Sequence, residues 1–572
     1  MLTPKTFIQS SQTSLTKWLQ ATAISLLASV SAATAVQAAE EVYFDFGPAG
    51  RSIPVSSLEA FAADGTVDED LGAYLNLLPA HRQQQFQQLL GIPLTSLSSS
   101  IPPELAKPYP LSQWLQSPIG ELALMRLGKV VQTLDRQNGG IALRSAMVLS
   151  AADPEGLSII NVLRLYPTAG LRINLVELLA LQKAMQANIQ ATEQLVATAA
   201  QQSAQAATTA PARDYAALPT LTETPRFEIT ARSLTLEDSQ RDRTFPVTLY
   251  RPVDLSAVPG EIPVVIMSHG YGDSRTNPEA NEAAQKMAAY GFVVVLPEHV
   301  GSNKNYQEDL TRGLAQESFE VMDFINRPLD IAFLLDTLEQ QNAAEFGGRL
   351  QLDRVGLFGH SFGGYTALAT AGATVDFEHL QAQCDLEANL KPEKLNTALL
   401  LQCRALELSE NPVAVRQLTD GSLADERIGF VMALAPVTNL FGDRSLSRLQ
   451  MPIVMIGGAK DIATPIIYEQ LDAFATLTTP EKYFYLSEDL SHTPGLTRAI
   501  LNIIEPKSER AQGFDELQQW FSDVAITLAI AHGRVHLLDD QTYDPYLTAA
   551  YVEANELDLA ELQLLRSAPE GL

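Results

Sequence analysis

The chain has 572 residues, more than one ordinary core accommodates, so two or three folding units are expected. Apolar residues make up 46% and charged residues 19% of the sequence, a balance typical of globular proteins. Acidic residues outnumber basic ones by 67 to 39, which gives a net charge of −28 at pH 7. Such a field repels phosphate backbones and anionic membrane surfaces, so we exclude nucleic acid as a partner, but not an uncharged lipid or ester substrate.

The N-terminal segment has the pattern of an export signal. Lys5 and Lys17 supply positive charge, an apolar stretch follows, and small residues run up to Ala38. Residues 36–38 fit a signal-peptidase site. We therefore predict a signal peptide over 1–38 and a periplasmic or extracellular location. The alternative is an uncleaved anchor helix, but the apolar run is short for a stable membrane span, and no second stretch resembles one.

Residues 39–205 are predicted to form a mainly helical N-terminal domain. An alternating apolar run at 42–46 indicates a short strand or extended arm, and apolar positions then recur at helical spacing. The last helix is expected from 174 to about 206. The segment 206–224 is rich in Ala, Gln, Thr and Pro, a composition typical of a linker. We find no catalytic cluster before this linker.

From residue 225 the pattern changes to strands that alternate with helices. Two alternating segments, Phe227–Leu236 and Thr244–Tyr250, indicate antiparallel strands. Short, fully apolar runs follow, and such runs are typical of strands buried on both faces of a parallel sheet. The order predicts a mostly parallel, doubly wound α/β domain over 225–572, with ligands at the carboxyl ends of its strands. The apolar runs are Val264–Met267, Phe292–Leu296, Val355–Phe358, Phe430–Leu434, Ile453–Ile456 and Tyr483–Leu486.

The strongest single motif is Gly359–Gly363, with the sequence GHSFG, which follows an apolar strand and opens a helix of small residues. A nucleophile elbow requires this context, because the chain reverses so tightly that only glycines fit around the serine. The hydroxyl is then exposed, and the N-terminus of the next helix lies beneath the developing oxyanion. We predict that Ser361 is a nucleophile; the alternative is an ordinary serine at the start of a helix.

A serine nucleophile needs a base, and the α/β-hydrolase fold presents its residues in the order serine, acid, histidine. His492 ends the strand near 483–486 and is the predicted base, the alternative being a capped histidine in a surface loop. Asp461 follows the strand at 453–456 and is the predicted acid, which would hold the imidazole in the right tautomer. Asp443, after the preceding strand, is the alternative acid.

An oxyanion hole needs two N–H groups, and the backbone of Phe362 is expected to supply one. The second is predicted at Tyr271 in the segment 268–272, SHGYG, where glycines let the backbone approach a substrate. The alternative is a plain glycine turn. We expect His269 to support this loop rather than to carry protons. Glu298 and His299 follow the strand at 292–296 and are expected to orient a loop; the alternative is that they line the pocket.

A long segment, Val375–Arg427, separates the helix after the serine from the next strand, and a plain connection needs only a few residues. We predict a small cap over the site; the alternative is a surface excursion without a role. It contains Cys384 and Cys403, the two cysteines of the chain. An oxidising compartment favours a disulfide over two free thiols. The cysteine spacing does not fit a zinc site, and we expect no metal or organic cofactor.

Several segments between roughly 225 and 500 together resemble the predicted dienelactone hydrolase family, a group similar to platelet-activating-factor acetylhydrolases and bacterial polyester hydrolases. True dienelactone hydrolases have a cysteine nucleophile where this chain has Ser361. The residues before the linker resemble a helical domain of unknown function that precedes such hydrolases in some photosynthetic bacteria. The segments that carry the main resemblance are 268–270, 297–303, 327–330, 359–364 and 458–465.

The resemblance implies an α/β-hydrolase fold, a triad of Ser361, Asp461 and His492, and oxyanion donors at Phe362 and Tyr271. Acetylhydrolases of the platelet-activating-factor type take their acid from the earlier strand, so the alternative acid stays open. We therefore expect an exported serine hydrolase that cleaves small or lipid carboxylic esters through an acyl-enzyme. The alternatives are an acyltransferase on the same fold and a catalytically vestigial binding or scaffold protein of the envelope. The sequence assigns no oligomeric state.

Overall fold

The computed structural model describes residues 39–46, 49–76, 78–91, 107–384, 396–492, 512–556 and 561–569. The described residues group into two compact units, the first drawn from 1–92 and 127–175 and the second from 93–126 and 176–572. The long helix α9 (Leu175–Thr208), which we assigned to the N-terminal domain, thus falls almost wholly in the second unit. The predicted signal peptide, 1–38, lies outside the described residues.

The first unit contains a sheet as well as helices, four strands in the part that is described, in the order β2-β1-β4-β3. β1 (Glu41–Phe46) pairs antiparallel with β2 (Ala49–Pro54) and parallel with β4 (Gly170–Asn174), which also pairs antiparallel with β3 (Val131–Thr133). The sequence indicated only the first of these strands. The helices here are α2 (Val55–Asp64), α3 (Glu69–Leu75), α4 (Ala80–Gly91), α7 (Gly140–Ala152) and α8 (Ile159–Arg164).

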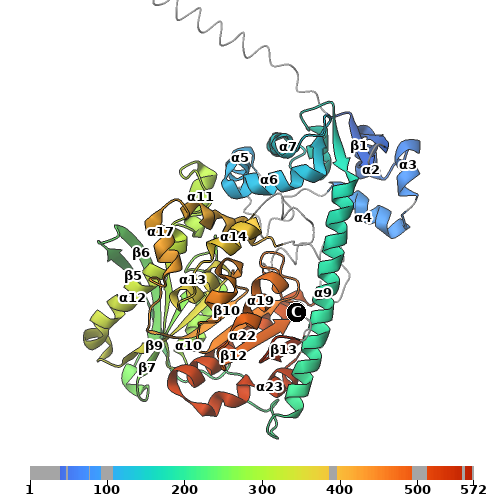
Figure 1. Ribbon diagram of the computed structural model, residues 1–572. Coiled ribbons are helices and arrows are strands. Elements are labelled where there is room, and N and C mark those ends of the chain that lie inside the picture. Colours follow the sequence, from blue (N-terminus) through green and yellow to red (C-terminus); the bar gives the residue numbers. More distant parts are fainter. Residues whose placement is uncertain are drawn as a thin grey trace, which may run out of the picture. The chain divides into compact units, whose positions relative to one another are not determined.

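The described part of the second unit contains a nine-stranded sheet in the order β13-β12-β11-β10-β9-β7-β8-β6-β5 (Figure 1). Its six central strands, β8, β7, β9, β10, β11 and β12, are parallel, whereas β5, β6 and β13 are antiparallel additions at the two edges. Each predicted apolar run overlaps one parallel strand, in agreement with an α/β fold. The bounds agree to within two residues, except that the strand around Val355–Phe358 begins at Leu350. The strands are β5 (Ile229–Asp238), β6 (Arg243–Pro252), β7 (Ile262–Ser268), β8 (Val293–Pro297), β9 (Leu350–His360), β10 (Ile428–Leu434), β11 (Ile453–Gly458), β12 (Lys482–Ser487) and β13 (Leu562–Leu565).

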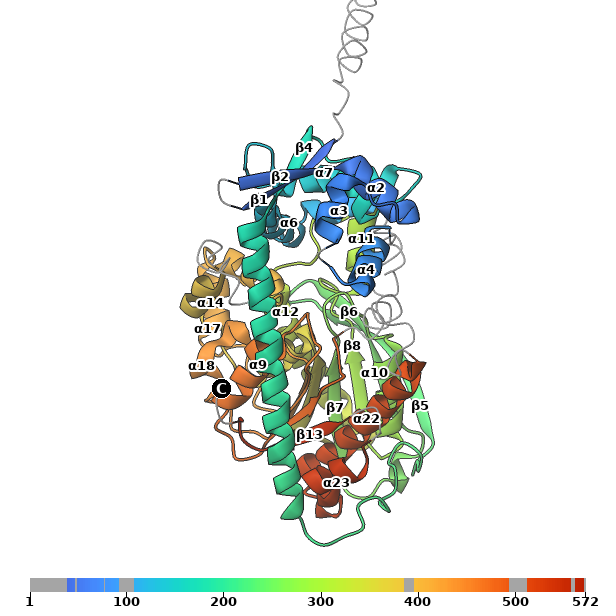
Figure 2. The same cartoon turned by 90° about the vertical axis from the view of Figure 1, so that its right-hand side faces the viewer.

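Helices cover both faces of this sheet (Figures 1 and 2). Successive strand residues point to opposite faces, so Val264 and Ile266 pack in one hydrophobic cluster and Val265 packs in another. The first cluster includes residues of α12 (Asp323–Phe346) and α13 (Phe362–Thr370). The second includes residues of α10 (Pro278–Ala288) and α22 (Phe514–Leu538). Burial on both faces explains why the parallel strands are continuously apolar.

The predicted insertion is partly helical where it is described, and residues 385–395 lie outside the description. The structure joins Cys384, at the end of α14 (Phe377–Cys384), to Cys403 through a disulfide. The insertion also contains α16 (Leu399–Gln402), the 3₁₀ turn η4 (Cys403–Leu408) and α17 (Pro412–Thr419). The remaining elements are α5 (Pro108–Gln116), α6 (Pro118–Val130), η3 (Leu255–Ala257), α11 (Lys304–Arg312), η5 (Asn439–Phe441), α18 (Gly442–Leu446), the π-helical η6 (Ile466–Leu471), α19 (Asp472–Thr476), η7 (Gln541–Leu547) and α23 (Ala549–Ala554).

Among the described helices, none combines the length and the apolar character that a membrane crossing requires.

Candidate active site

Ser361 lies at the sharp turn between β9 and α13, with φ 56° and ψ −118°. A non-glycine residue rarely has a positive φ, and such strain concentrates at functional sites. A Cβ on Gly359 would lie 2.0 Å from the carbonyl oxygen of Gly363, and a Cβ on Gly363 would lie 2.0 Å from that of Ser268. The two flanking glycines are therefore required by space alone, as a nucleophile elbow demands.

The carboxyl ends of three parallel strands bring a serine, a histidine and an aspartate together. The Oγ of Ser361 lies 2.9 Å from Nε2 of His492, and Nδ1 of His492 lies 2.9 Å from Oδ2 of Asp461. These residues follow β9, β12 and β11, respectively. The three strands are parallel, so their carboxyl ends lie on the same side of the sheet. We assign the Nδ1–H tautomer to His492, because only then does Nε2 accept the serine proton.

The carboxylate of Asp461 is held in place from several directions. Its Oδ1 accepts hydrogen bonds from the N–H groups of Ala463 (2.9 Å) and Thr464 (2.8 Å). Its Oδ2 accepts a bond of 2.7 Å from the hydroxyl of Thr464, and the residue is only 5% exposed. The alternative acid, Asp443, is an exposed residue in the first turn of α18. The structure therefore brings Asp461, and not Asp443, to the histidine.

The ring of His360 packs on the ring of His492, and sequence reasoning gave this residue no role. The ring centroids are 4.8 Å apart. Although part of His360 is exposed, its surroundings are mostly protein, and this loss of water lowers the pKa of His360 to about 3, with His492 adding to the effect. His360 is thus a neutral neighbour of the imidazole that contacts the serine.

Phe362 and Tyr271 are the two predicted oxyanion donors. Within the described residues, neither backbone N–H donates a hydrogen bond to another group. Phe362 is the first residue of α13, where helical N–H groups have no intrahelical partner. Tyr271 follows Gly270, whose Cβ, if present, would lie 3.3 Å from Cβ of Ser361. The loop after β7 thus approaches the serine closely, which a glycine permits.

The loop histidines have the contacts of supporting residues. Nε2 of His269 accepts a hydrogen bond of 3.0 Å from the N–H of His299, and its Nδ1 lies 2.8 Å from the carbonyl oxygen of Gly270. Nε2 of His299 lies 2.8 Å from Oγ of Ser268. Burial, with a contribution from Arg327, lowers the pKa of His269 to about 3 and also lowers that of His299, so both rings are neutral.

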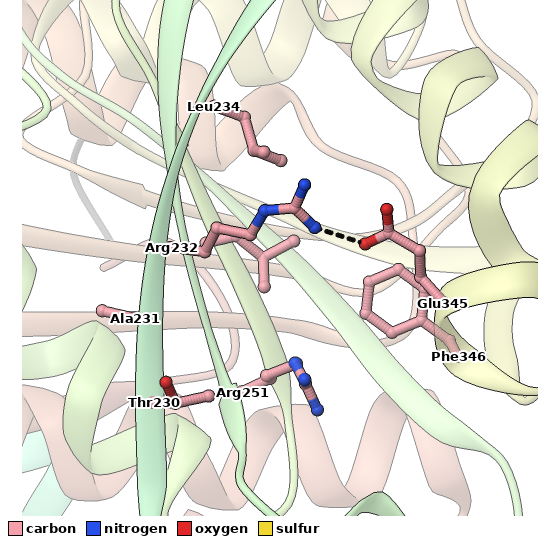
Figure 3. A pocket seen from close by; sticks show the side chains of 8 residues that line it. Thr230, Ala231, Arg232, Leu234, Arg251, Glu345 and Phe346 are labelled. Carbon is pink, nitrogen blue, oxygen red and sulfur yellow. Dashed lines mark hydrogen bonds and ion pairs between the residues drawn. The ribbon is translucent and has the colours of Figure 1, made fainter.

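The two cavities that we describe lie away from the serine. One, of about 270 Å³, lies between the β5–β6 hairpin and the end of α12, where Arg232 pairs with Glu345 (Figure 3). The other, of about 590 Å³, lies at the amino ends of β10, β11 and β12, whereas Ser361 lies at the carboxyl end of β9. Within the described ranges, no group of three or more His, Cys, Asp or Glu side chains is arranged to hold a metal ion.

A comparison with curated proteins finds no match for the chain. A family model described as "Alpha/beta hydrolase of unknown function (DUF1400)" matches residues 38–174. These residues precede the nine-stranded sheet, and most of them belong to the first unit. Over residues 38–174 the chain is therefore similar to a family of α/β hydrolases of unknown function, and the α/β domain that contains Ser361 follows this region.

Proposed function

We propose that this protein is an exported serine hydrolase that cleaves carboxylic esters through an acyl-enzyme. One observation carries the proposal: Ser361, His492 and Asp461 form a continuous series of hydrogen bonds, 2.9 Å at each step, and Ser361 lies on a strained turn between a strand and a helix. In this arrangement the carboxylate orients the imidazole, and the imidazole can accept the proton of the serine hydroxyl. This is how a serine is activated as a nucleophile.

In the proposed reaction, Nε2 of His492 takes the proton as Ser361 Oγ attacks the ester carbonyl carbon. The N–H groups of Phe362 and Tyr271 bind the oxyanion of the tetrahedral intermediate. Asp461 stabilises the imidazolium and keeps its orientation. His492 then gives the proton to the leaving alcohol, and water deprotonated by His492 hydrolyses the acyl-serine. Every step uses groups of this chain and a water molecule.

The substrates that we propose are small or lipid esters without a net negative charge. The net charge of −28 disfavours the approach of anionic substrates. The location outside the cytoplasm rests on the signal-like residues 1–38. The acyl length is the property to measure, with a series of nitrophenyl esters of increasing chain length.

A fluorophosphonate probe tests the proposal, because it reacts covalently with an activated serine. We expect stoichiometric labelling of the wild type and none of Ser361→Ala. Ser447→Ala is a matched control, because Ser447 is a described serine outside the site and its variant is expected to label fully. Well-folded wild-type protein that does not label would contradict the enzyme and favour the scaffold. Products formed with added alcohol distinguish hydrolysis from acyl transfer.

A further inference from the structure

Arg327 is the largest side chain that is completely buried in the described residues. It lies on α12, and its guanidinium points at the loop after β7. Nη1 donates to the carbonyl oxygen of His269 over 2.7 Å, and Nη2 lies 3.3 Å from that of Gly270. Nε donates to Oγ of Ser302 over 2.9 Å. A buried cation therefore holds the backbone on the N-terminal side of Tyr271.

The contact with Gly270 matters because of peptide geometry. The carbonyl of Gly270 and the N–H of Tyr271 belong to one planar peptide group and point in opposite directions. Fixing the oxygen therefore fixes the direction of the N–H. His269 contributes too: its Nε2 accepts from the N–H of His299, so its proton is on Nδ1, which donates to the same oxygen over 2.8 Å. Two donors on one carbonyl also polarise the peptide and strengthen its N–H as a donor.

Arg327 also contacts the residue that supplies the other N–H. Its guanidinium carbon lies 4.4 Å from the ring centroid of Phe362, a cation–π distance. That ring is fully buried and packs edge-on against Phe324, with centroids 5.1 Å apart. One side chain thus contacts both segments that contain the predicted oxyanion donors.

Burying the charge of Arg327 costs free energy, because the guanidinium loses its contacts with water. A buried guanidinium is less favourable than an apolar side chain of similar size unless its donors and charge are matched. Asp323 Oδ2 lies 3.8 Å from Nε, and Ser302 links the two through its hydroxyl. Burial lowers the pKa of Arg327 to about 10, against the effect of Asp323, so the side chain stays charged at neutral pH.

We propose that Arg327 is a positioning residue of the oxyanion hole, which aims and polarises the Gly270–Tyr271 peptide and holds the ring of Phe362. The inference rests on the proposed function. Its action passes through the peptide, and Arg327 itself contacts no reacting atom. It follows that loss of Arg327 affects the turnover of bound ester far more than the binding of ester in the ground state.

The test compares Arg327→Met and Arg327→Lys with Arg349→Met. Arg349 is a matched control, because it also donates to backbone carbonyls, those of Leu255, Val258 and Gly260, but near the start of β7. Each variant is assayed for kcat and KM with a nitrophenyl ester. Affinity for a trifluoromethyl ketone, whose hemiketal with the serine places an oxyanion in the hole, is measured in parallel, together with the urea unfolding midpoint.

We expect R327M to lower kcat about 100-fold, as loss of one oxyanion donor does, with KM changed less than about threefold. Affinity for the ketone should fall by a similar factor. R327K, which keeps the charge but not the planar fork, is expected to lose about 10-fold in kcat. R349M should keep kcat within about threefold of wild type, even if it unfolds at lower urea.

Folded R327M with wild-type kcat and ketone affinity would overturn the inference, and so would a raised KM at unchanged kcat. If R327M does not fold, R327K decides: a kcat within twofold of wild type contradicts the positioning role. These failures differ from failure of the proposed function, in which the wild type itself neither turns over the ester nor reacts with the fluorophosphonate.

Discussion

The imidazole of His360 lies against the imidazole of His492, with ring centroids 4.8 Å apart and planes tilted by 34°. Two histidines in contact raise the question of which one titrates in the activity range. The pKa of His360 is lowered to about 3 by its protein surroundings and by His492. His360 therefore remains neutral as the pH falls toward 4.

The pH profile tests this relationship. Because His360 gains no proton in this range, we expect log(kcat/KM) to fall with a slope no steeper than one as the medium is acidified to about pH 4. His360→Phe should keep that slope, since it removes a ring that does not titrate there. A slope near two in the wild type, reduced to one in H360F, would show that both rings gain protons together.

Replacing the acid should lower turnover severely. The amide of Asp461→Asn can donate to Nδ1 of His492, which then carries its proton on Nε2 and cannot act as base. We expect kcat to fall about 10⁴-fold. Asp443→Asn is the control, and its kcat should stay within twofold of wild type, because Asp443 is exposed on α18. The reverse ranking of the two variants in steady-state assays would assign the acid role to Asp443.

The elbow glycines give a prediction about stability. Gly363→Ala places a methyl group 2.0 Å from the carbonyl oxygen of Ser268, so the turn must shift. We expect a loss of about 1–3 kcal/mol in the free energy of unfolding, together with loss of activity. Gly260→Ala, where φ is 72° but no atom lies within 4 Å, should cost about 1 kcal/mol and leave activity intact. Equal activity in the two variants, measured beside urea unfolding, would contradict this account.

Buried histidines predict how stability depends on pH. Burial lowers the pKa of His269 to about 3 and holds those of His299 and His532 well below the ordinary 6.5. Below pH 6.5 the unfolded chain binds protons on these residues that the folded chain does not, so stability falls as the pH drops from 7 to 5. Burial raises the pKa of Asp323 to about 6, which has the opposite sign and offsets part of the loss.

Urea unfolding at a series of pH values measures this effect. His532→Phe should reduce the slope of the free energy of unfolding against pH by up to one proton, because this ring is fully buried and neutral in the fold. A free energy of unfolding that rises on acidification from pH 7 to 5 would be incompatible with neutral buried histidines.

The disulfide provides a further test. Cys384 and Cys403 are 19 residues apart, and in the chain-entropy model closing such a loop stabilises the fold by about 3 kcal/mol. We expect the double variant Cys384→Ser/Cys403→Ser to lose a free energy of unfolding of that order. Dithiothreitol should lower the stability of the wild type by the same amount and leave the double variant unchanged. An equal response of both proteins to the reductant would argue against the pairing.

The central sheet could be predicted because burial on both faces leaves a direct trace in sequence. Runs such as Val264–Met267 are apolar at every position, and each lies in one of the parallel strands. The edge strand β13 and the strands β3 and β4 leave no such trace, because polar residues interrupt them: Gln563 in β13, Gln132 in β3 and Arg172 in β4. Their partners are far away in the chain, so local periodicity does not reveal them.

For the site, the order of elements led to Ser361, His492 and Asp461, which the structure places within hydrogen-bond distance of one another. Their catalytic roles stay predictions. The choice between Asp461 and Asp443 needed geometry, since both follow strands. Arg327 lies in the segment 327–330, which carries part of the resemblance, but its contact with two backbone carbonyls could not be predicted from the sequence. Every residue has a backbone carbonyl, so the residue types that Arg327 contacts do not reveal the contact.

The pairing of β13 with β12 has a consequence for biosynthesis. β12 leads directly into the loop that holds His492, yet its outer edge is covered by a strand that the ribosome makes much later. Leu564 of β13 is in turn tied to α9 through Ser203, a residue made far earlier. Until β13 emerges, the nascent chain exposes an apolar strand with unsatisfied backbone groups, a template for aggregation. From this topology we expect the nascent chain to need a chaperone until β13 has been made.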